Sequence, residues 1–217
     1  MTTIAVDIDS TLYDFETPFR QAFLDLALEH GDKDHYFRGA YQSWVEWRSP
    51  SDVCGFDAFS QALDRVHSDE VIQSRTPYDH SVGVLQALSE NNKLIYVSNR
   101  SPDCHRATKE WLYDCGFPNG DLICVMGDKE PYVSECRYII DDRPKTLVQF
   151  VYNFAWRRAI NAGLRDERKG FGLLFEHNRA LTDVPGIFLA PTWAGIGYYL
   201  SKEGVLDESS VRNLSLS

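Results

Sequence analysis

The sequence predicts an α/β protein whose core is a doubly wound, Rossmann-like parallel sheet with a helical segment inserted after the first strand. Three observations lead to this prediction. Short apolar runs alternate with amphipathic helical stretches, polar residues follow four of these runs, and residues 31–78 contain no convincing strand. With 217 residues and 43% hydrophobic content, the chain can bury a full core.

The elements expected before residue 80 are one strand and a group of helices. The apolar run that starts at Ile4 ends in Asp7 and Asp9, as expected of a buried strand with a polar end. A helix is expected from Thr17-Pro18 to a stop at Gly31. The next residues are rich in aromatic side chains at helical spacing, including Trp44 and Trp47. We therefore expect a helical cap over residues 16–79.

The remaining elements alternate between helices and strands. Helices are expected at 81–90, 101–115 and 144–159, and strands at 93–97, 122–126 and 138–140, with edge strands at 172–175 and 186–189. Residues 1–15 and 80–200 are then the α/β core, and the Ser-rich residues 201–217 form a C-terminal tail. In such sheets, ligands bind beyond the carboxyl ends of the strands.

Charge and composition narrow the classes of partner. A net charge of -10 disfavours passive attraction to nucleic acid or anionic lipid, whereas a small phosphorylated substrate held through a metal is compatible with it. No apolar run is long enough to span a bilayer, and no basic and apolar leader precedes the first strand, so we expect a cytoplasmic protein without a membrane partner. The sequence leaves the oligomeric state open.

Four polar clusters follow apolar runs that would end at the same edge of the sheet. In chain order they are Asp7 with Asp9 and Thr11, Ser98-Asn99-Arg100, Lys129, and Asp141-Asp142. Phosphoryl transfer from a monoester needs a nucleophile, a proton donor for the leaving oxygen and positive charge around the other oxygens. These clusters contain side chains for each task.

The two acids of the first cluster are the candidate catalytic residues. Asp7 is the candidate nucleophile that forms an aspartyl-phosphate, and Asp9 is the candidate acid and base. Mg²⁺ prefers oxygen ligands, which Asp7, the Asp9 carbonyl and one of Asp141 and Asp142 can supply. The sequence does not decide which member of that pair ligates the ion directly.

The other clusters carry the candidate phosphate and substrate contacts. Ser98, Asn99 and the neighbouring backbone N–H groups are expected to hold a phosphate oxygen. Lys129 is expected to balance the carboxylates and the charge on the transferred group. Arg100, which follows Asn99 in the chain, is expected to contact the substrate.

The four clusters, in their order along the chain, resemble the motifs of the haloacid dehalogenase (HAD) superfamily. With h for a hydrophobic and x for any residue, these are hhhhDxDxT, hhhhS/T, a lysine, and an acidic pair after the last core strand. The segments that match are Val6 to Thr11, Val97-Ser98, Lys129 and Ile140 to Asp142. The resemblance covers residues 1–15 and 80–160. It implies an HAD-like core with a small helical cap, and a Mg²⁺-dependent phosphatase.

A narrower resemblance is to the 5'(3')-deoxyribonucleotidases of that superfamily. The run from Asp7 to Glu16 looks like their D-x-D-G-V-L-A-D-F-E opening, although Ser10 and Thr11 stand where that family has Gly-Val. Ile139 to Pro144 resembles their I-D-D-R-P. Leu174 to Arg179, with Trp193 downstream, looks like their late L-F-x-x-x-H-N-R and W segment, with shorter spacing before the histidine. This resemblance implies a (deoxy)nucleoside monophosphate substrate whose base stacks near Phe15.

Three alternatives stay open. HAD 3'-phosphatases that act on polynucleotide ends share the Ser98-x-Arg100 pattern, and the basic residues between 157 and 169 could contact a nucleic-acid backbone. Another HAD phosphatase activity is the second alternative. The third is a non-catalytic module that uses the metal site to bind nucleotides.

Overall fold

The structure is a computed structural model that describes residues 2–31, 34–41 and 54–207. Among the described residues, six parallel strands form one sheet in the order β3-β2-β1-β4-β5-β6. The strands are β1 (Thr2–Val6), β2 (Asn92–Ser98), β3 (Asp121–Cys124), β4 (Tyr138–Ile140), β5 (Lys169–Leu173) and β6 (Ile187–Ala190). The predicted α/β fold with a doubly wound parallel sheet is confirmed.

The central strand β1 pairs with β2 on one side and β4 on the other. Ile4 is opposite Leu94 in β2 and Tyr138 in β4. Successive strand residues point to opposite faces, so Ile4 and Val6 join one buried cluster and Ala5 joins the other. Because β1 is covered on both faces and paired on both sides, the polar residues that follow it are held at a fixed position.

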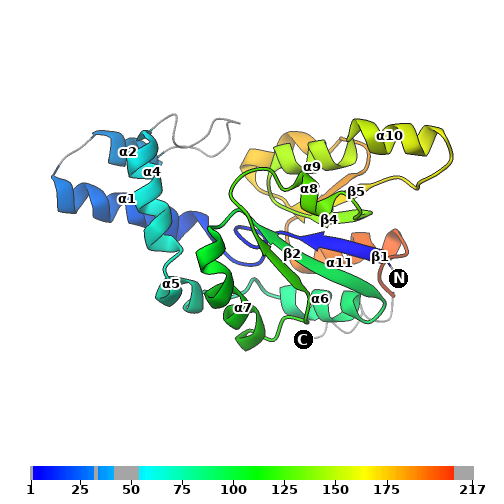
Figure 1. Ribbon diagram of the computed structural model, residues 1–217, viewed down its shortest axis with the longest axis horizontal. Coiled ribbons are helices and arrows are strands. Elements are labelled where there is room, and N and C mark those ends of the chain that lie inside the picture. The colour runs from blue at the N-terminus through cyan, green and yellow to red at the C-terminus, as the bar shows by residue number, and fades with distance from the viewer. Residues whose placement is uncertain (1, 32–33, 42–53, 208–217) are drawn as a thin grey trace.

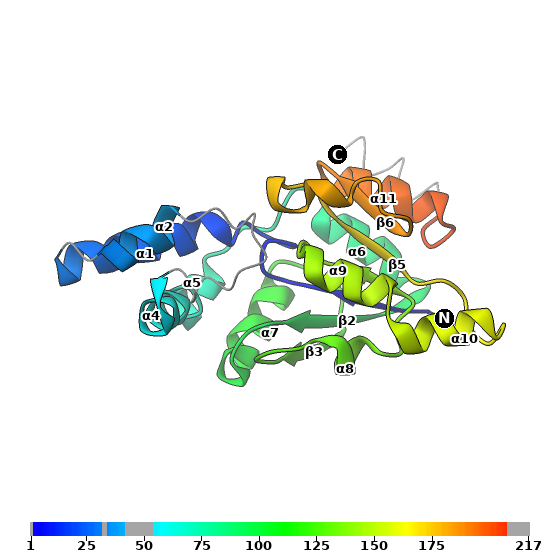
Figure 2. The same cartoon turned by 90° about the horizontal axis from the view of Figure 1, so that it is seen from above.

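Helices cover both faces of the sheet (Figure 1). One layer contains α6 (Ser81–Ser89), α7 (His105–Asp114), which follows a short 3-10 turn at Pro102–Cys104, and α11 (Trp193–Lys202). On the other face lie α8 (Glu130–Val133), α9 (Pro144–Val151) and α10 (Phe154–Asn161). Figure 2 shows the two layers from above, with the sheet between them.

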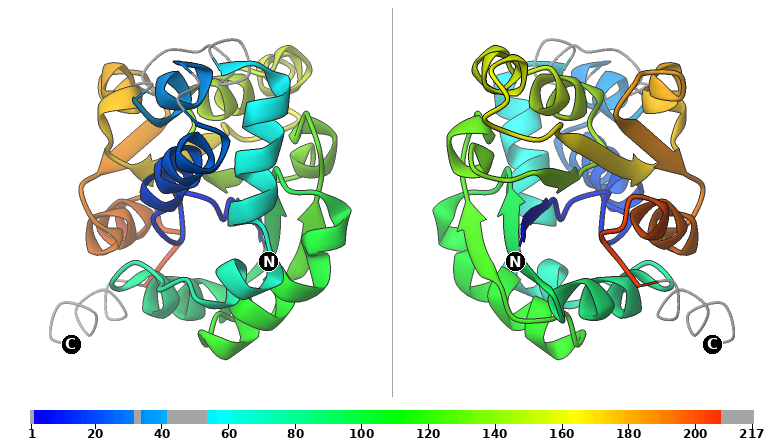
Figure 3. Two further views of the ribbon diagram at one scale, coloured as in Figure 1. Left: turned by 90° about the vertical axis from the view of Figure 1, so that its left-hand side faces the viewer. Right: turned by 90° about the vertical axis from the view of Figure 1, so that its right-hand side faces the viewer.

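Between β1 and α6 the described residues form helices: α1 (Glu16–His30), α2 (Asp34–Tyr41), α4 (Phe56–Val66) and α5 (Asp69–Gln73). Helices α1, α2 and α4 project from the end of the sheet at which β1 stops (Figures 1 and 3). They share a buried apolar cluster of their own, which includes Phe19, Phe23 and Ala62. The division into a core and a cap over residues 16–79 stays a prediction, and Trp44 and Trp47 lie outside the described residues.

Two expected elements differ in the structure. The helix expected over 144–159 is two helices, because Asn153 interrupts it and caps α10 by accepting a hydrogen bond from the Trp156 N–H at 2.9 Å. The strand expected at 172–175 is β5, which lies inside the sheet between β4 and β6 rather than at its edge. Glycines are weak strand formers, but a Cβ at Gly172 would lie 2.4 Å from the Asp141 carbonyl oxygen, so the close packing there requires glycine.

The expected tail begins with residues that pack on the core. Helix α11 continues to Lys202, and Leu206 is buried in the cluster that contains Leu200. Among the described residues, no helix combines the length and the apolar character that crossing a bilayer requires.

Candidate active site

The loop after β1 places two carboxylates at the carboxyl end of the sheet. The Asp7 N–H continues the ladder to the Ile140 carbonyl at 2.8 Å, and the chain then turns, with the Leu12 N–H donating to the Ile8 carbonyl at 2.8 Å. Ser10 in this turn has a φ of 60°, which lies in the left-handed region that favours glycine. The nucleotidase pattern has glycine at this position, so the departure noted in the sequence introduces backbone strain.

The Asp7 carboxylate lies in a buried group of charges. Lys129 Nζ donates to Asp7 Oδ1 at 2.5 Å and to Asp141 Oδ2 at 3.0 Å, while Thr11 Oγ1 donates to Asp7 Oδ2 at 3.1 Å. These four residues are at most 5% exposed. The structure therefore brings together residues from three of the four predicted clusters around Asp7.

Burial raises the pKa of Asp7 to about 6, and the neighbouring charges of Asp141 and Asp9 add to this rise while Lys129 opposes it. Burial also raises the pKa of Asp141. For Lys129, burial alone would lower the pKa, but Asp141 and Asp7 outweigh it and raise the pKa above its ordinary value. The negative charge of Asp7 and Asp141 therefore exceeds the positive charge that Lys129 supplies.

One oxygen each of Asp7, Asp141 and Asp142 lies within 4.8 Å of the others. Three buried carboxylates beside one ammonium group fit a divalent cation with oxygen ligands, such as Mg²⁺. The carboxylate of Asp9 does not belong to this group, and its predicted metal contact through the main-chain carbonyl stays a prediction. Asn178, which is fully buried, supports the acidic pair by donating to the Asp142 carbonyl at 3.0 Å.

The Asp9 carboxylate lies among a different set of groups, supplied largely by the loop after β2. Its Oδ2 accepts from Ser98 Oγ at 2.8 Å and from Arg100 Nε at 3.0 Å. Its Oδ1 accepts from Arg100 Nη2 at 2.8 Å and from the Tyr13 hydroxyl at 2.5 Å. Burial alone would raise the pKa of Asp9, but the charge of Arg100 outweighs it and holds the pKa well below the ordinary value.

Two residues predicted to contact phosphate or substrate lie elsewhere in the network. Arg100 is fully buried, and besides Asp9 it binds Thr108 Oγ1 at 2.7 Å, so its observed partners are protein groups rather than an accessible surface. Asn99 is assigned the amide orientation in which its Nδ2 donates to the Gly127 carbonyl at 2.8 Å and its Oδ1 accepts from Arg143 Nη1 at 2.9 Å. It joins the loops that follow β2, β3 and β4.

Phe15 lies at the junction between the sheet and the helices inserted after β1. Its ring is half-buried and stacks on Phe19, with the centroids 5.1 Å apart. It also lies 5.5 Å from the ring of His67, the residue that ends α4. The predicted stacking of a nucleobase on Phe15 stays a prediction.

The sequence reasoning assigned no task to three residues that the structure places in the network: Tyr13, His67 and Trp193. Tyr13 donates to Asp9, and Trp193 Nε1 donates to the Thr11 carbonyl at 2.8 Å, which fixes the turn after Asp9. The signal for Trp193 was present, because the late nucleotidase-like segment includes a tryptophan at this position. Tyr13 and His67 carry no comparable spacing.

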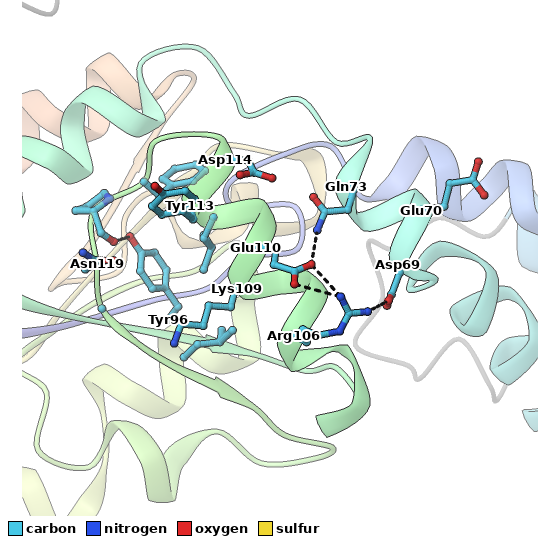
Figure 4. A pocket seen from close by; sticks show the side chains of 15 residues that line it. Asp69, Glu70, Gln73, Tyr96, Arg106, Lys109, Glu110, Tyr113, Asp114 and Asn119 are labelled. Carbon is cyan, nitrogen blue, oxygen red and sulfur yellow. Dashed lines mark hydrogen bonds and ion pairs between the residues drawn. The ribbon is translucent and has the colours of Figure 1, made fainter.

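A cavity of about 550 Å³ lies away from these carboxylates, between α5, α7 and the loop before β3 (Figure 4). Four of its polar side chains pair with one another: Arg106 binds Asp69 and Glu110, and Gln73 Nε2 donates to Glu110 at 3.4 Å. Asp7, Asp9 and their partners do not line it. The cavity is therefore separate from the candidate active site.

Several solved structures share this fold. An HAD-family hydrolase from Deinococcus radiodurans R1, with bound phosphate and sodium, is 13% identical, with a TM-score of 0.59 over 95% of this chain and 98% of its own. An HAD-like hydrolase from Streptococcus pneumoniae is 15% identical (TM-score 0.58; 92% and 98%). The defluorinating L-2-haloacid dehalogenase Rha0230 is also 15% identical (TM-score 0.50; 93% and 95%).

These likenesses, at low identity, show that the fold is HAD-like. No protein-family model matches the sequence, and the comparison with curated proteins found no match.

Proposed function

We propose that the protein is a Mg²⁺-dependent phosphomonoester hydrolase that acts on (deoxy)nucleoside monophosphates through an aspartyl-phosphate. One observation carries the proposal: Asp7 lies with Asp141 and Asp142 in a buried group of carboxylates around Lys129, at the carboxyl end of the sheet. The order of the motifs and the HAD-like fold support it. The choice of nucleotides rests on the resemblance around Phe15.

In the proposed reaction, one oxygen of Asp7 attacks phosphorus and the bond from phosphorus to the ester oxygen breaks. Mg²⁺, held by Asp7, Asp141 or Asp142, would neutralise charge between the nucleophile and the phosphate. Lys129 holds Asp7 in place and offsets the negative charge around it, while Thr11 fixes the other Asp7 oxygen. Water then attacks the aspartyl-phosphate, which releases phosphate and restores the carboxylate.

The departing alkoxide takes up a proton, which the sequence analysis assigned to Asp9. A general acid works best when its pKa lies near the operating pH. In this structure Asp9 accepts four hydrogen bonds and Arg100 keeps its pKa low. Asp9 can therefore donate a proton only if the contacts with Arg100 rearrange when substrate binds.

Phosphate release from a panel of substrates tests the proposal. The panel contains nucleoside 5'- and 3'-monophosphates, sugar phosphates and p-nitrophenyl phosphate, each with Mg²⁺ and with EDTA, and halide release from an L-2-haloacid is measured alongside. We expect Mg²⁺-dependent release that is fastest from nucleotides and lost in Asp7→Asn. Unchanged turnover in Asp7→Asn would contradict the mechanism, and faster release from sugar phosphates would contradict the choice of nucleotides.

The second candidate is a polynucleotide 3'-phosphatase, supported by Arg157 and Arg158, which lie over the rings of Tyr152 and Phe154 at 4.8 and 5.9 Å. The rest of the basic stretch is occupied: Arg168 is buried against main-chain carbonyls, and Arg165 pairs with Glu135 at 3.0 Å. This candidate predicts release from 3'-phosphorylated oligonucleotides that falls with salt and with Arg157→Glu/Arg158→Glu. Indifference to both changes would reject it.

A further inference from the structure

His67 lies at the end of α4 and is fixed in place from both sides. Its main-chain N–H donates to the Leu63 carbonyl at 2.9 Å, and its main-chain carbonyl accepts from Cys104 Sγ at 3.6 Å. Its ring packs against Phe15 at an interplanar angle of 34°. The imidazole is therefore an ordered part of the junction between the inserted helices and the sheet.

The Nε2 atom of His67 is directed at the candidate active site without a hydrogen bond. The side chain is only 9% exposed, and Nε2 is 3.7 Å from Asp9 Oδ1, which is too far for a hydrogen bond. Nε2 is buried and has no hydrogen-bond partner in the described part of the chain. A buried polar atom left in this way costs about 1–3 kcal/mol, so its retention calls for a function.

Nε2 lies within ion-pair distance of Asp9, but the carboxylate takes its hydrogen bonds from other groups. Its Oδ1 already accepts from Tyr13 and Arg100, and its Oδ2 accepts from Ser98 and Arg100. His67 is therefore not required to hold the carboxylate. The unused Nε2 instead lies beside Asp9, on the side of the site to which the inserted helices belong.

We propose that His67 Nε2 hydrogen-bonds to the leaving-group oxygen of the phosphate ester, which makes His67 a catalytic residue contributed by the inserted helices. This inference rests on the proposed function, in which the leaving oxygen departs from phosphorus on the side away from Asp7 and towards Asp9. Alkoxide leaving groups, such as those of nucleotides and sugars, depend strongly on such a hydrogen bond. A nitrophenolate does not, because its charge is delocalised.

The test compares His67→Phe and His67→Gln with wild type on two esters, p-nitrophenyl phosphate and the best-hydrolysed nucleoside monophosphate. His67→Phe keeps an aromatic ring against Phe15 but removes the nitrogen. His67→Gln restores a polar group near the position of Nε2. The matched control is His30→Phe, because His30 also stacks on an aromatic ring, Tyr36, at 5.5 Å.

We expect His67→Phe to lower kcat on the nucleotide by about 100-fold, the usual effect of losing one preorganised donor, with little change on p-nitrophenyl phosphate. His67→Gln should recover part of the loss, and His30→Phe should lose nothing. An equal loss on both esters together with a lowered Tm would show a structural role and overturn the inference, as would wild-type rates in His67→Phe. If wild type hydrolyses neither ester, the proposed function fails and this inference fails with it.

Discussion

Asp7 and Asp9 lie two residues apart in one loop, yet the groups around them differ in nearly every respect. Asp7 shares Lys129 with Asp141, Asp142 lies close to both carboxylates, and the pKa of Asp7 is raised to about 6. Asp9 has an arginine to itself, and its pKa is held well below the ordinary value. Around Asp7 the negative charge exceeds the positive charge, whereas around Asp9 the charge of Arg100 balances the carboxylate.

The difference follows from the position of β1 in the sheet. Asp7 turns towards β4, where the next polar residues are Asp141 and Asp142, whereas Asp9 turns towards β2, where they are Ser98 and Arg100. A D-x-D pair after a central strand thus reaches two neighbouring strands at once. The spacing brings the two acids together, and the neighbouring strands decide what each acid does.

The largest expected effect is the loss of turnover when Asp7 or Asp9 is replaced, and the two losses should differ in size. Asp7→Asn should reduce kcat by at least about 10⁴-fold because it removes the nucleophile. Asp9→Asn should reduce it by about 10²- to 10⁴-fold, the range of a lost proton-transfer group. Steady-state rates with Mg²⁺ on the best-hydrolysed nucleotide measure both. A smaller loss in Asp7→Asn than in Asp9→Asn would reverse the assignment of roles.

The next comparison replaces the basic residue beside each acid, Lys129 beside Asp7 and Arg100 beside Asp9. Lys129→Met and Arg100→Met should each destabilise the metal-free protein by about 3–5 kcal/mol, because each leaves buried carboxylates without their partner. Thermal denaturation with EDTA and with Mg²⁺ measures the effect. Mg²⁺ should restore Tm in Lys129→Met, where the ion replaces the lost charge, and should do so far less in Arg100→Met. Equal restoration would contradict a metal site on the Asp7 side alone.

Acid titration should show opposite signs at the two residues. The folded pKa of Asp7, about 6, exceeds its ordinary value of 3.8, so its contribution to the free energy of unfolding is greatest below pH 4 and falls as the pH rises through 6. For Asp9 the folded pKa is the lower one, so its contribution is present above pH 3.8 and is lost on acidification below that value.

Chemical denaturation in EDTA between pH 3 and 7 tests these signs. At pH 7, Asp7→Asn should be more stable than wild type by on the order of 3 kcal/mol, and this advantage should largely disappear by pH 4. Asp9→Asn should instead be less stable than wild type at pH 7. The same sign in both variants would contradict the contrast between the two sites.

The smallest expected effect lies in the residue that follows the pair. Ser10 has a φ of 60°, so Ser10→Gly should raise the free energy of unfolding by about 1 kcal/mol as the strain is relieved. The control is Ser74→Gly, where φ is -81° and glycine should cost about 0.5–1 kcal/mol. Urea denaturation compares the two, and a destabilised Ser10→Gly would show that this turn is not strained.

The sequence was sufficient for the fold class and for most strands, because apolar runs and turn residues mark them directly. Strand β5 was misplaced because glycines weaken the pattern of an interior strand, whereas here Gly172 packs closely against the Asp141 carbonyl and Gly170 against Leu147 of α9. The motifs brought Asp7, Lys129, Asp141 and Asp142 into one hypothesis. The pairing of Arg100 with Asp9 could not be predicted, since it depends on how the loops after β1 and β2 face each other. His67 was missed because its contact crosses 58 residues of chain without a motif.

The central position of β1 also affects how the protein is made. This strand leaves the ribosome well before its partners, because Thr2 pairs with Asn92 and Ile4 pairs with Tyr138. Trp193, which fixes the turn after Asp9, follows later still. Asp7 and Asp9 are therefore synthesised well before the residues that hold them in place, and a nascent chain stalled before β4 would expose an apolar strand with no partner on that side.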